Sequence, residues 1–289
     1  TTTGEYNIGI GHLAVFENTT GSYNIGIGKG ALQNTTASNN TAVGYQAGYS
    51  NVTGAENTFI GRVAGYSTTN SYNVAVGDAA LYSNTSGGTN TAVGKSALLS
   101  NTTASNNAAL GYRALEDNTT GAGNTALGTI ALPNNTTGAD NVSIGHLSMG
   151  DNSTGNYNVA VGKSALTSNT TASNNTAVGY QSLLDNTTGV RNSAFGDNSL
   201  ANNTTANNNN AFGYLSLHTN TTGTQNVAMG TEALFANTTA SDNTAVGYQA
   251  LLSNTTGNRN SAVGLESLKS NTTGSENVAM GRKAMRVNT

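Results

Sequence analysis

Apolar and polar residues follow one short pattern that recurs throughout the 289-residue chain. Cut before each Asn-Thr-Thr, the sequence divides into 17 units, fifteen of 17 residues and two of 16, and Asn288–Thr289 begin another. The two short units are Asn18–Gln33 and Thr68–Ser83. A representative unit is Asn237–Ser253, NTTASDNTAVGYQALLS, and we number its positions as columns 1 to 17. Helix-pair repeats need about 33 residues or more, so this period predicts a stack of single coils.

The columns differ sharply in what they contain. Column 7 is Asn and column 11 is Gly in every unit, column 10 is always apolar and column 15 is mainly Leu. Column 9 is small, with Phe59 as the exception, and column 14 is only Ala or Ser. The stretch N-T-A-V-G predicts a short strand and A-L-x-S a second one, with Asn, Thr and Gly at the corners. The column 11 Gly indicates a bend or a close backbone approach, where a Cβ would clash.

Stacked coils place each strand about 4.8 Å from its copy in the next coil. The predicted fold is therefore all-β, a parallel β-solenoid (β-roll) of 17-residue coils that runs through residues 1–289 as a single domain. We expect columns 10 and 15 to form apolar ridges inside it, and the Asn columns to form ladders of bonded amides. The small residues of columns 9 and 14 would let another sheet approach closely, which favours a homotrimer, with a monomeric solenoid as the alternative.

Composition narrows the functional classes. Charged residues make up 9% of the chain, the net charge is −3 and there is no Cys. The lack of a basic run argues against a nucleic-acid partner, and no stretch reaches the roughly 18 apolar residues of a membrane span. Solenoid ends normally carry polar caps, and neither end departs from the repeat. We therefore expect a piece of a longer protein or a unit that stacks end to end.

Catalytic chemistry needs groups that converge, and the repeat keeps them apart. His12 and His146 share column 12 but are eight coils apart, and His218 is in column 16. Asp117 and Asp151 recur in column 17 two coils apart, roughly 10 Å on the strand spacing, which is too far for a shared proton. We expect no enzymatic activity, no metal site and no cofactor.

Three copies of the repeat resemble known surface proteins. They read NTAVGYQAG at Asn40–Gly48, NTAVGYQSL at Asn175–Leu183 and NTAVGYQAL at Asn243–Leu251. These copies resemble repeats of bacterial and phage tail-fibre-type surface proteins. More distantly, N-x-A-V/I-G resembles the head repeats of YadA-like trimeric autotransporter adhesins. The resemblance implies a trimeric, left-handed parallel β-roll on a cell surface or virion fibre that binds host or matrix surfaces.

A stripe of tyrosines suggests a ligand surface. Units with TTA in place of TTG at columns 2 to 4 all carry Tyr in column 12, and these residues are Tyr45, Tyr112, Tyr180, Tyr214 and Tyr248. Aromatic rings stack on sugars, so an alternative function is a carbohydrate-binding tail-fibre module. The other interpretation is that these rings cover the surface or pack between chains.

Column 1 carries a modification signal. Fifteen units have Asn-x-Ser/Thr there, the acceptor pattern for N-glycosylation in secreted proteins. The candidates that we single out are Asn18, Asn34, Asn101, Asn118, Asn186, Asn254 and Asn271. The other interpretation is a plain Asn-Thr corner.

Column 3 is Thr or Ser through most of the repeat. If the backbone is extended there, columns 1 and 3 point the same way, and the resulting Asn-x-Thr array resembles those of ice-binding solenoids. Ice binding is therefore a second alternative. The first expectation remains a structural, non-enzymatic, extracellular or cell-surface fibre or adhesin segment. Its expected partners are its own copies, as a homotrimer or an end-to-end fibre, and surface glycans or host and matrix proteins.

Overall fold

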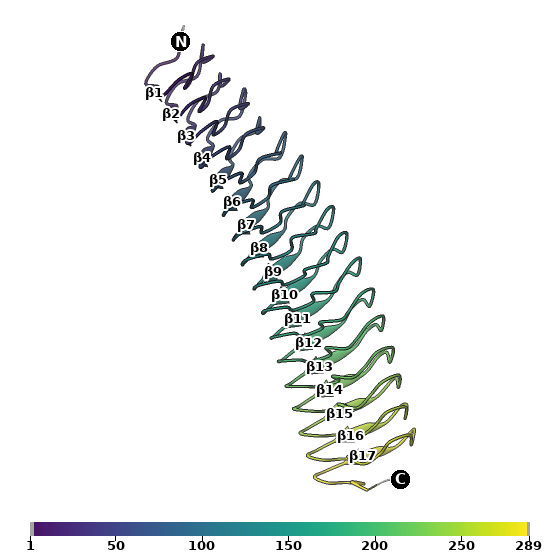
Figure 1. Cartoon of the computed structure of the whole chain (residues 1–289). Helices are drawn as coiled ribbons and strands as arrows, with labels where there is room; N and C mark the ends of the chain where they lie inside the picture. The colour runs from purple at the N-terminus through teal and green to yellow at the C-terminus, as the bar shows by residue number, and fades with distance from the viewer. Residues whose placement is uncertain (1–2, 288–289) are drawn as a thin grey trace. The chain divides into compact units, whose positions relative to one another are not determined.

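The computed structural model describes residues 3–287, and the chain divides into two compact units, one up to Ser143 and one from Ile144. Each unit is all-β, without a helix among the described residues, and each repeat forms one coil of a parallel β-solenoid (Figure 1). The predicted fold class is thereby confirmed. The unit boundary falls inside a repeat and inside a strand, and no change in the sequence pattern marks it.

In the first unit every strand has three residues and pairs in parallel, in register, with the next strand along the chain. The strands are β1 (Ile8–Ile10), β2 (Ile25–Ile27), β3 (Thr41–Val43), β4 (Thr58–Ile60), β5 (Val74–Val76), β6 (Thr91–Val93), β7 (Ala108–Leu110) and β8 (Thr125–Leu127), with β9 (Val142–Ile144) at the unit boundary.

The second unit repeats this arrangement, so that identical columns face one another through its whole stack. Its strands are β10 (Val159–Val161), β11 (Thr176–Val178), β12 (Ser193–Phe195), β13 (Asn210–Phe212), β14 (Val227–Met229), β15 (Thr244–Val246), β16 (Ser261–Val263) and β17 (Val278–Met280).

Each coil has one strand, at columns 8 to 10, and the second predicted strand is absent from the described residues. Columns 13 and 15 adopt left-handed backbone angles, as at Ser96 (φ 58°) and Leu98 (φ 51°), which no extended strand can contain. Main-chain hydrogen bonds still join the coils there, since the Leu98 N–H donates to the Ala114 carbonyl at 3.0 Å. The A-L-x-S segment is therefore a hydrogen-bonded turn that directs Leu inward.

The column 11 glycines meet the expectation of a close approach. At Gly213, φ is 139°, and a Cβ would lie 2.7 Å from the carbonyl carbon of Gly230 in the next coil. Both the backbone angle and the contact with neighbouring main chain exclude a side chain. Because the column 11 residue has no side chain, the coils can stack at the spacing of hydrogen-bonded strands.

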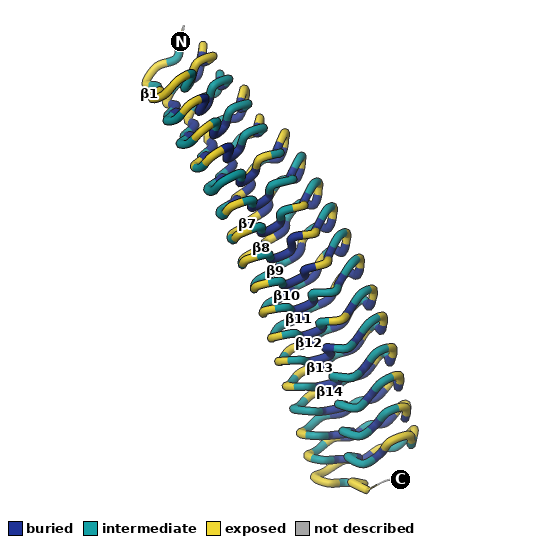
Figure 2. Tube along the Cα trace, viewed as in Figure 1, coloured by how far each residue is buried: buried dark blue, intermediate teal, exposed yellow. Residues whose placement is uncertain are grey.

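The interior is lined by columns 9, 14 and 15, and the outer sheet face by columns 8 and 10 (Figure 2). In one coil Ala211, Ser216 and Leu217 are fully buried, whereas Phe212 is 37% exposed. The prediction of an inner ridge was right for column 15 and wrong for column 10. Alternate residues of a strand point to opposite faces, and the narrow interior accepts the small column 9 residue beside Leu. Columns 9 and 14 are consequently unavailable to a second chain.

Phe59, the exception in column 9, shows how tightly the interior is filled. Column 15 is Gly48 in the preceding coil and Gly65 in its own coil, where most coils have Leu. A Cβ on Gly48 would lie 2.6 Å from the Phe59 ring, and one on Gly65 would lie 2.2 Å from it. The buried ring therefore occupies the volume that two leucines fill elsewhere.

Candidate functional surfaces

The column 1 asparagines form a buried ladder. Asn118 Nδ2 donates to Asn101 Oδ1 in the preceding coil at 2.9 Å and to the Gly121 carbonyl of its own corner at 2.9 Å. Six of the seven glycosylation candidates are at most 1% exposed, namely Asn18, Asn101, Asn118, Asn186, Asn254 and Asn271. A glycan on such an Nδ2 would have to replace interior packing and break these bonds. The geometry therefore favours corner residues over acceptor sites in the folded chain.

Asn34, the seventh candidate, does not occupy column 1. The first short coil lies elsewhere than the division of the sequence placed it. Thr35 occupies the buried column 1 position and Asn34 the half-buried column 17 position, so the short coil is Thr35–Ser50 and not Asn18–Gln33. The second short coil begins with the equally buried Thr68, as predicted. In both coils a single residue, Ala37 or Asn70, separates columns 1 and 2 from the column 5 Ser. Its carbonyl accepts from the column 7 Asn of the preceding coil, as column 4 carbonyls do, so column 3 is the missing one.

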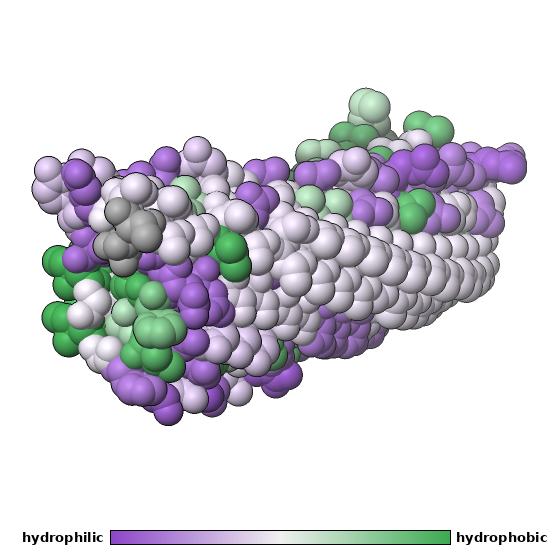
Figure 3. All heavy atoms as spheres, turned by 90° about the horizontal axis from the view of Figure 1, so that it is seen from above, coloured by the Kyte–Doolittle hydropathy of each residue, from purple (hydrophilic) through white to green (hydrophobic). Residues whose placement is uncertain are grey.

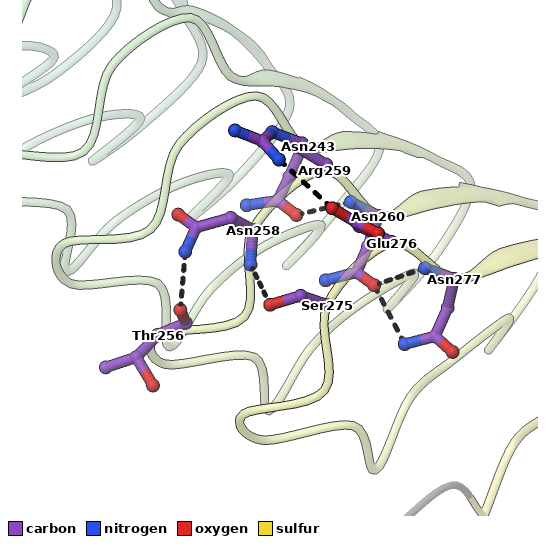
Figure 4. A network of polar contacts seen from close by, with 8 residues as sticks. All are labelled: Asn243, Thr256, Asn258, Arg259, Asn260, Ser275, Glu276 and Asn277. Atoms are coloured by element: carbon purple, nitrogen blue, oxygen red, sulfur yellow. Dashed lines mark hydrogen bonds and ion pairs between the residues drawn. The ribbon is translucent and has the colours of Figure 1, made fainter.

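The column 7 asparagines form a second ladder, parallel to the first. Asn260 N–H donates to Asn243 Oδ1 at 2.9 Å, and Asn277 donates to Asn260 Oδ1 through both N–H and Nδ2 at 3.0 Å (Figure 4). Asn260 Nδ2 also reaches the Gly274 carbonyl at 2.8 Å. The two Asn columns thus share the column 4 carbonyl as acceptor, which ties the corner of one coil to its neighbour.

Beside this ladder the surface corner carries solvent-exposed polar pairs. Arg259 Nη1 lies 3.0 Å from Glu276 Oε1, and Asn258 N–H donates to Ser275 Oγ at 2.9 Å (Figure 4). These residues and Asp242 line a shallow polar hollow of about 320 Å³. Both members of the ion pair are about 70% exposed, so the pair contributes little to stability.

The five column 12 tyrosines are separated by other residue types. Their exposed fractions lie between 44% and 50%, which leaves about half of each ring in solvent. In the second unit Tyr180, Tyr214 and Tyr248 occupy alternate coils. Lys163 Nζ, one coil before, lies 5.9 Å from the Tyr180 ring centroid, so one face of that ring is turned along the stack. The structure therefore exposes the predicted residues without gathering them into a flat aromatic surface.

An aromatic stack that was not predicted from the sequence occurs in column 16. Tyr49, Tyr66 and Tyr82 lie in consecutive coils with ring centroids 5.1–5.2 Å apart and nearly parallel planes. Burial raises the pKa of the Tyr66 phenol, with smaller contributions from Tyr82 and Tyr49. The signal was present in the sequence, because three Tyr recur at the coil period. The rings cover one another's faces, which suits a structural role.

The threonines of column 3 form an exposed rank in the second unit. All are exposed, namely Thr154, Thr171, Thr188, Thr205, Thr222, Thr239, Thr256 and Thr273. Columns 1 and 3 do not point the same way, because the segment is a bend and Asn points inward. The column 2 hydroxyls are engaged between coils, as Thr187 Oγ1 donates to the Thr204 carbonyl at 3.0 Å. The predicted Asn-x-Thr array is thus wrong, and a single Thr rank stands in its place.

The outer sheet face carries exposed apolar side chains in both units. Phe195 and Phe212 stack with centroids 4.9 Å apart, and the neighbouring Met229 is 45% exposed. In the first unit Val93, Leu110 and Leu127 border an apolar hollow of about 350 Å³ centred on the small Ala108. At the end of this unit that faces the viewer in Figure 3, apolar residues also gather at the surface; Ile8 and Ile10 of β1 are 48% and 59% exposed.

Charged side chains are sparse and paired near the end of the second unit. Glu266 faces Lys269 Nζ and Arg286 Nε, both at 3.1 Å. The hydrogen bond from Lys269 is the main cause that lowers the pKa of Glu266, followed by the charges of Arg286, Lys269 and Lys283. Glu266 is the one carboxylate among three basic groups, so the cluster keeps a net positive charge while its groups pair with one another.

The three histidines lie apart, as expected from their columns. His218 Nδ1 is 3.1 Å from the Asn198 carbonyl oxygen and its ring stacks on Phe235, while His12 and His146 are exposed. Within residues 3–287 no group of three or more His, Cys, Asp or Glu side chains could hold a metal ion. Over the same residues no helix has the length and apolarity needed to cross a bilayer.

Models of known protein families give no match to this chain, and curated proteins give none either.

Proposed function

We propose that the chain is a structural, non-enzymatic segment of an extracellular fibre or adhesin. The observation that carries the proposal is the use of interior polar groups to join one coil to the next. In a typical corner, Asn186 Nδ2 donates to Asn169 Oδ1 at 3.2 Å and Asn192 N–H to Asn175 Oδ1 at 2.9 Å. Buried amides that are committed in this way serve cohesion.

The backbone adds further hydrogen bonds between neighbouring coils. Leu200 N–H donates to the Ser216 carbonyl, and Gly213 N–H to the Phe195 carbonyl, at 2.9 and 2.8 Å. In the second unit each coil is therefore joined to its neighbours through a recurring set of bonds. Stability in such an array is a sum over neighbouring layers, so length can grow without a new core. This property suits a spacer that must hold a fixed form over a long distance.

The exterior supports a location outside the cell. Threonine is the most frequent residue at exposed positions of the described chain. The resemblance of the NTAVGYQ copies to fibre-type surface proteins points the same way. Adhesion to glycans or matrix proteins would use the exposed tyrosine and threonine ranks, and association with further copies would give the fibre its thickness.

Immunogold electron microscopy tests the proposal. Antibodies raised against the purified chain are applied to intact cells or virions that carry it, and antibody pre-adsorbed with the chain is the control. Label on surface appendages is the expected result. Label that appears only after the cells are opened would overturn the extracellular fibre.

A further inference from the structure

We propose that the outer sheet face, columns 8 and 10, is the surface by which this chain binds a second copy of itself. The inference deepens the fibre function proposed above and rests on it. It replaces the prediction that columns 9 and 14 serve contact between chains, because those columns line the interior.

The chemistry of this face is constant from coil to coil. In the second unit its column 10 side chains are all apolar, namely Val161, Val178, Phe195, Phe212, Met229, Val246, Val263 and Met280. Column 8 provides Val, Thr, Ser and Asn, and no charged residue occurs in either column. Continuous exposed apolar patches are rare on monomeric soluble proteins and usually mark an interface. The lack of charge favours an equally uncharged partner.

The period of the face identifies that partner. Column 10 side chains form a ridge that repeats at the strand spacing of about 4.8 Å. Only another stack of in-register strands offers grooves of the same period along its whole length, and a second copy of this chain has one. Sheets of stacked, in-register strands can pack face to face with interdigitated side chains, about 10 Å apart. The twisted sheet of an ordinary globular domain would match over a few strands only.

The exposed area of this face in one unit approaches the area of a standard interface. Phe195 and Phe212 are each 37% exposed, and an aromatic side chain offers about 150–250 Å² in all, so each leaves on the order of 70 Å² outside. With a smaller part from column 8, the eight strands of the second unit offer on the order of 700 Å². A standard interface buries about 800 Å² per partner. One unit therefore comes close to the requirement by itself.

The test introduces carboxylates into the ridge of the full chain. Phe195→Glu with Met229→Glu places one charge on β12 and one on β14, two coils apart. In a face-to-face pair these groups would be buried without partners. The matched control is Thr188→Glu with Thr222→Glu, in the same two coils but on the exposed column 3 rank. Light scattering after size-exclusion chromatography gives the mass, and circular dichroism verifies the fold.

The expected result is a multimeric parent chain and a multimeric control, with the ridge variant reduced to single chains and its apparent Kd raised at least about 100-fold. A multimer that the ridge substitutions leave intact would overturn the inference, since association would then use another surface. A parent chain that is monomeric at micromolar concentration would overturn it as well. The immunogold result is independent of both outcomes, so failure of this interface and failure of the fibre function can be told apart.

Discussion

Replacing one asparagine of the column 1 ladder tests whether these amides hold the coils together. Asn203 lies within the second unit and is fully buried. Its Nδ2 donates to Asn186 Oδ1 at 2.8 Å and to the Ala206 carbonyl at 3.1 Å, and its Oδ1 accepts from Asn220 Nδ2 at 3.0 Å. Asn203→Ala removes all three bonds and leaves an interior void.

The size of the effect follows from those contacts. Three hydrogen bonds at a net value of about 1 kcal/mol each give about 3 kcal/mol. Asn186 Oδ1 also loses its donor from the next coil while it stays buried, which adds about 1–3 kcal/mol. We therefore expect Asn203→Ala to lower the free energy of unfolding by roughly 4–6 kcal/mol. Asn202→Ala, one residue earlier in a half-buried surface position, should cost less than about 0.5 kcal/mol.

Hydrogen exchange is the suitable measurement, because stacked repeats can open locally without unfolding globally. Amides of the coils on either side of Asn203 should exchange about 100-fold faster or more in Asn203→Ala, whereas distant coils of the same unit should change less. Urea denaturation gives the summed effect. If Asn203→Ala and Asn202→Ala behave alike in both measurements, the ladder does not stabilise the stack and the reasoning fails.

Three further predictions concern glycine, core volume and pH. Gly213→Ala should lower the free energy of unfolding in urea by about 3 kcal/mol or more, because the new Cβ would meet the backbone of the next coil. Gly281→Ala should lower it clearly less, because a Cβ there would have no atom within 4 Å. Equal losses would exclude the steric explanation. Phe59→Ala should cost about 3–5 kcal/mol, and adding Gly65→Leu should restore part of this by refilling the volume, as thermal unfolding of both variants would reveal. The lowered pKa of Glu266 stabilises the fold above the usual Glu pKa, and this contribution is lost as pH falls through the lowered value. Urea midpoints of Glu266→Gln should therefore depend less on acidic pH than those of the parent chain, and parallel curves would contradict this.

Periodicity was sufficient to predict the fold. Identical residues at a fixed interval imply identical surroundings, and a 17-residue period leaves room for one coil only. The glycines of column 11, the buried leucines of column 15 and both asparagine ladders followed from that inference. What periodicity cannot give is direction, because a column that is always apolar can face the interior or another chain.

Column 10 was assigned to the interior for this reason, and the sequence held one signal against it. Phe59 in column 9 coincides with Gly48 and Gly65 in column 15, so a large residue in one column is compensated by small residues in the other. Compensation of volume requires contact, which places columns 9 and 15 in the same interior. Alternation along the strand then puts column 10 outside. Three exceptional residues thus carried more information on orientation than the regular ones.

The hydrogen bonds of the corner explain why the short coils begin with threonine. The column 1 Asn closes its corner by bonds to the residue three positions on, as when Asn51 Nδ2 donates to the Gly54 carbonyl and Gly54 N–H returns to Asn51 Oδ1. When column 3 is deleted, that partner is only two positions away and the closed arrangement is lost. Thr35 and Thr68 stand in column 1 of the two short coils, each with a buried Oγ1 that lacks a hydrogen-bond partner. The column 1 Asn is therefore a requirement of the four-residue corner, and the likeness of this segment to a glycosylation signal follows in part from that requirement.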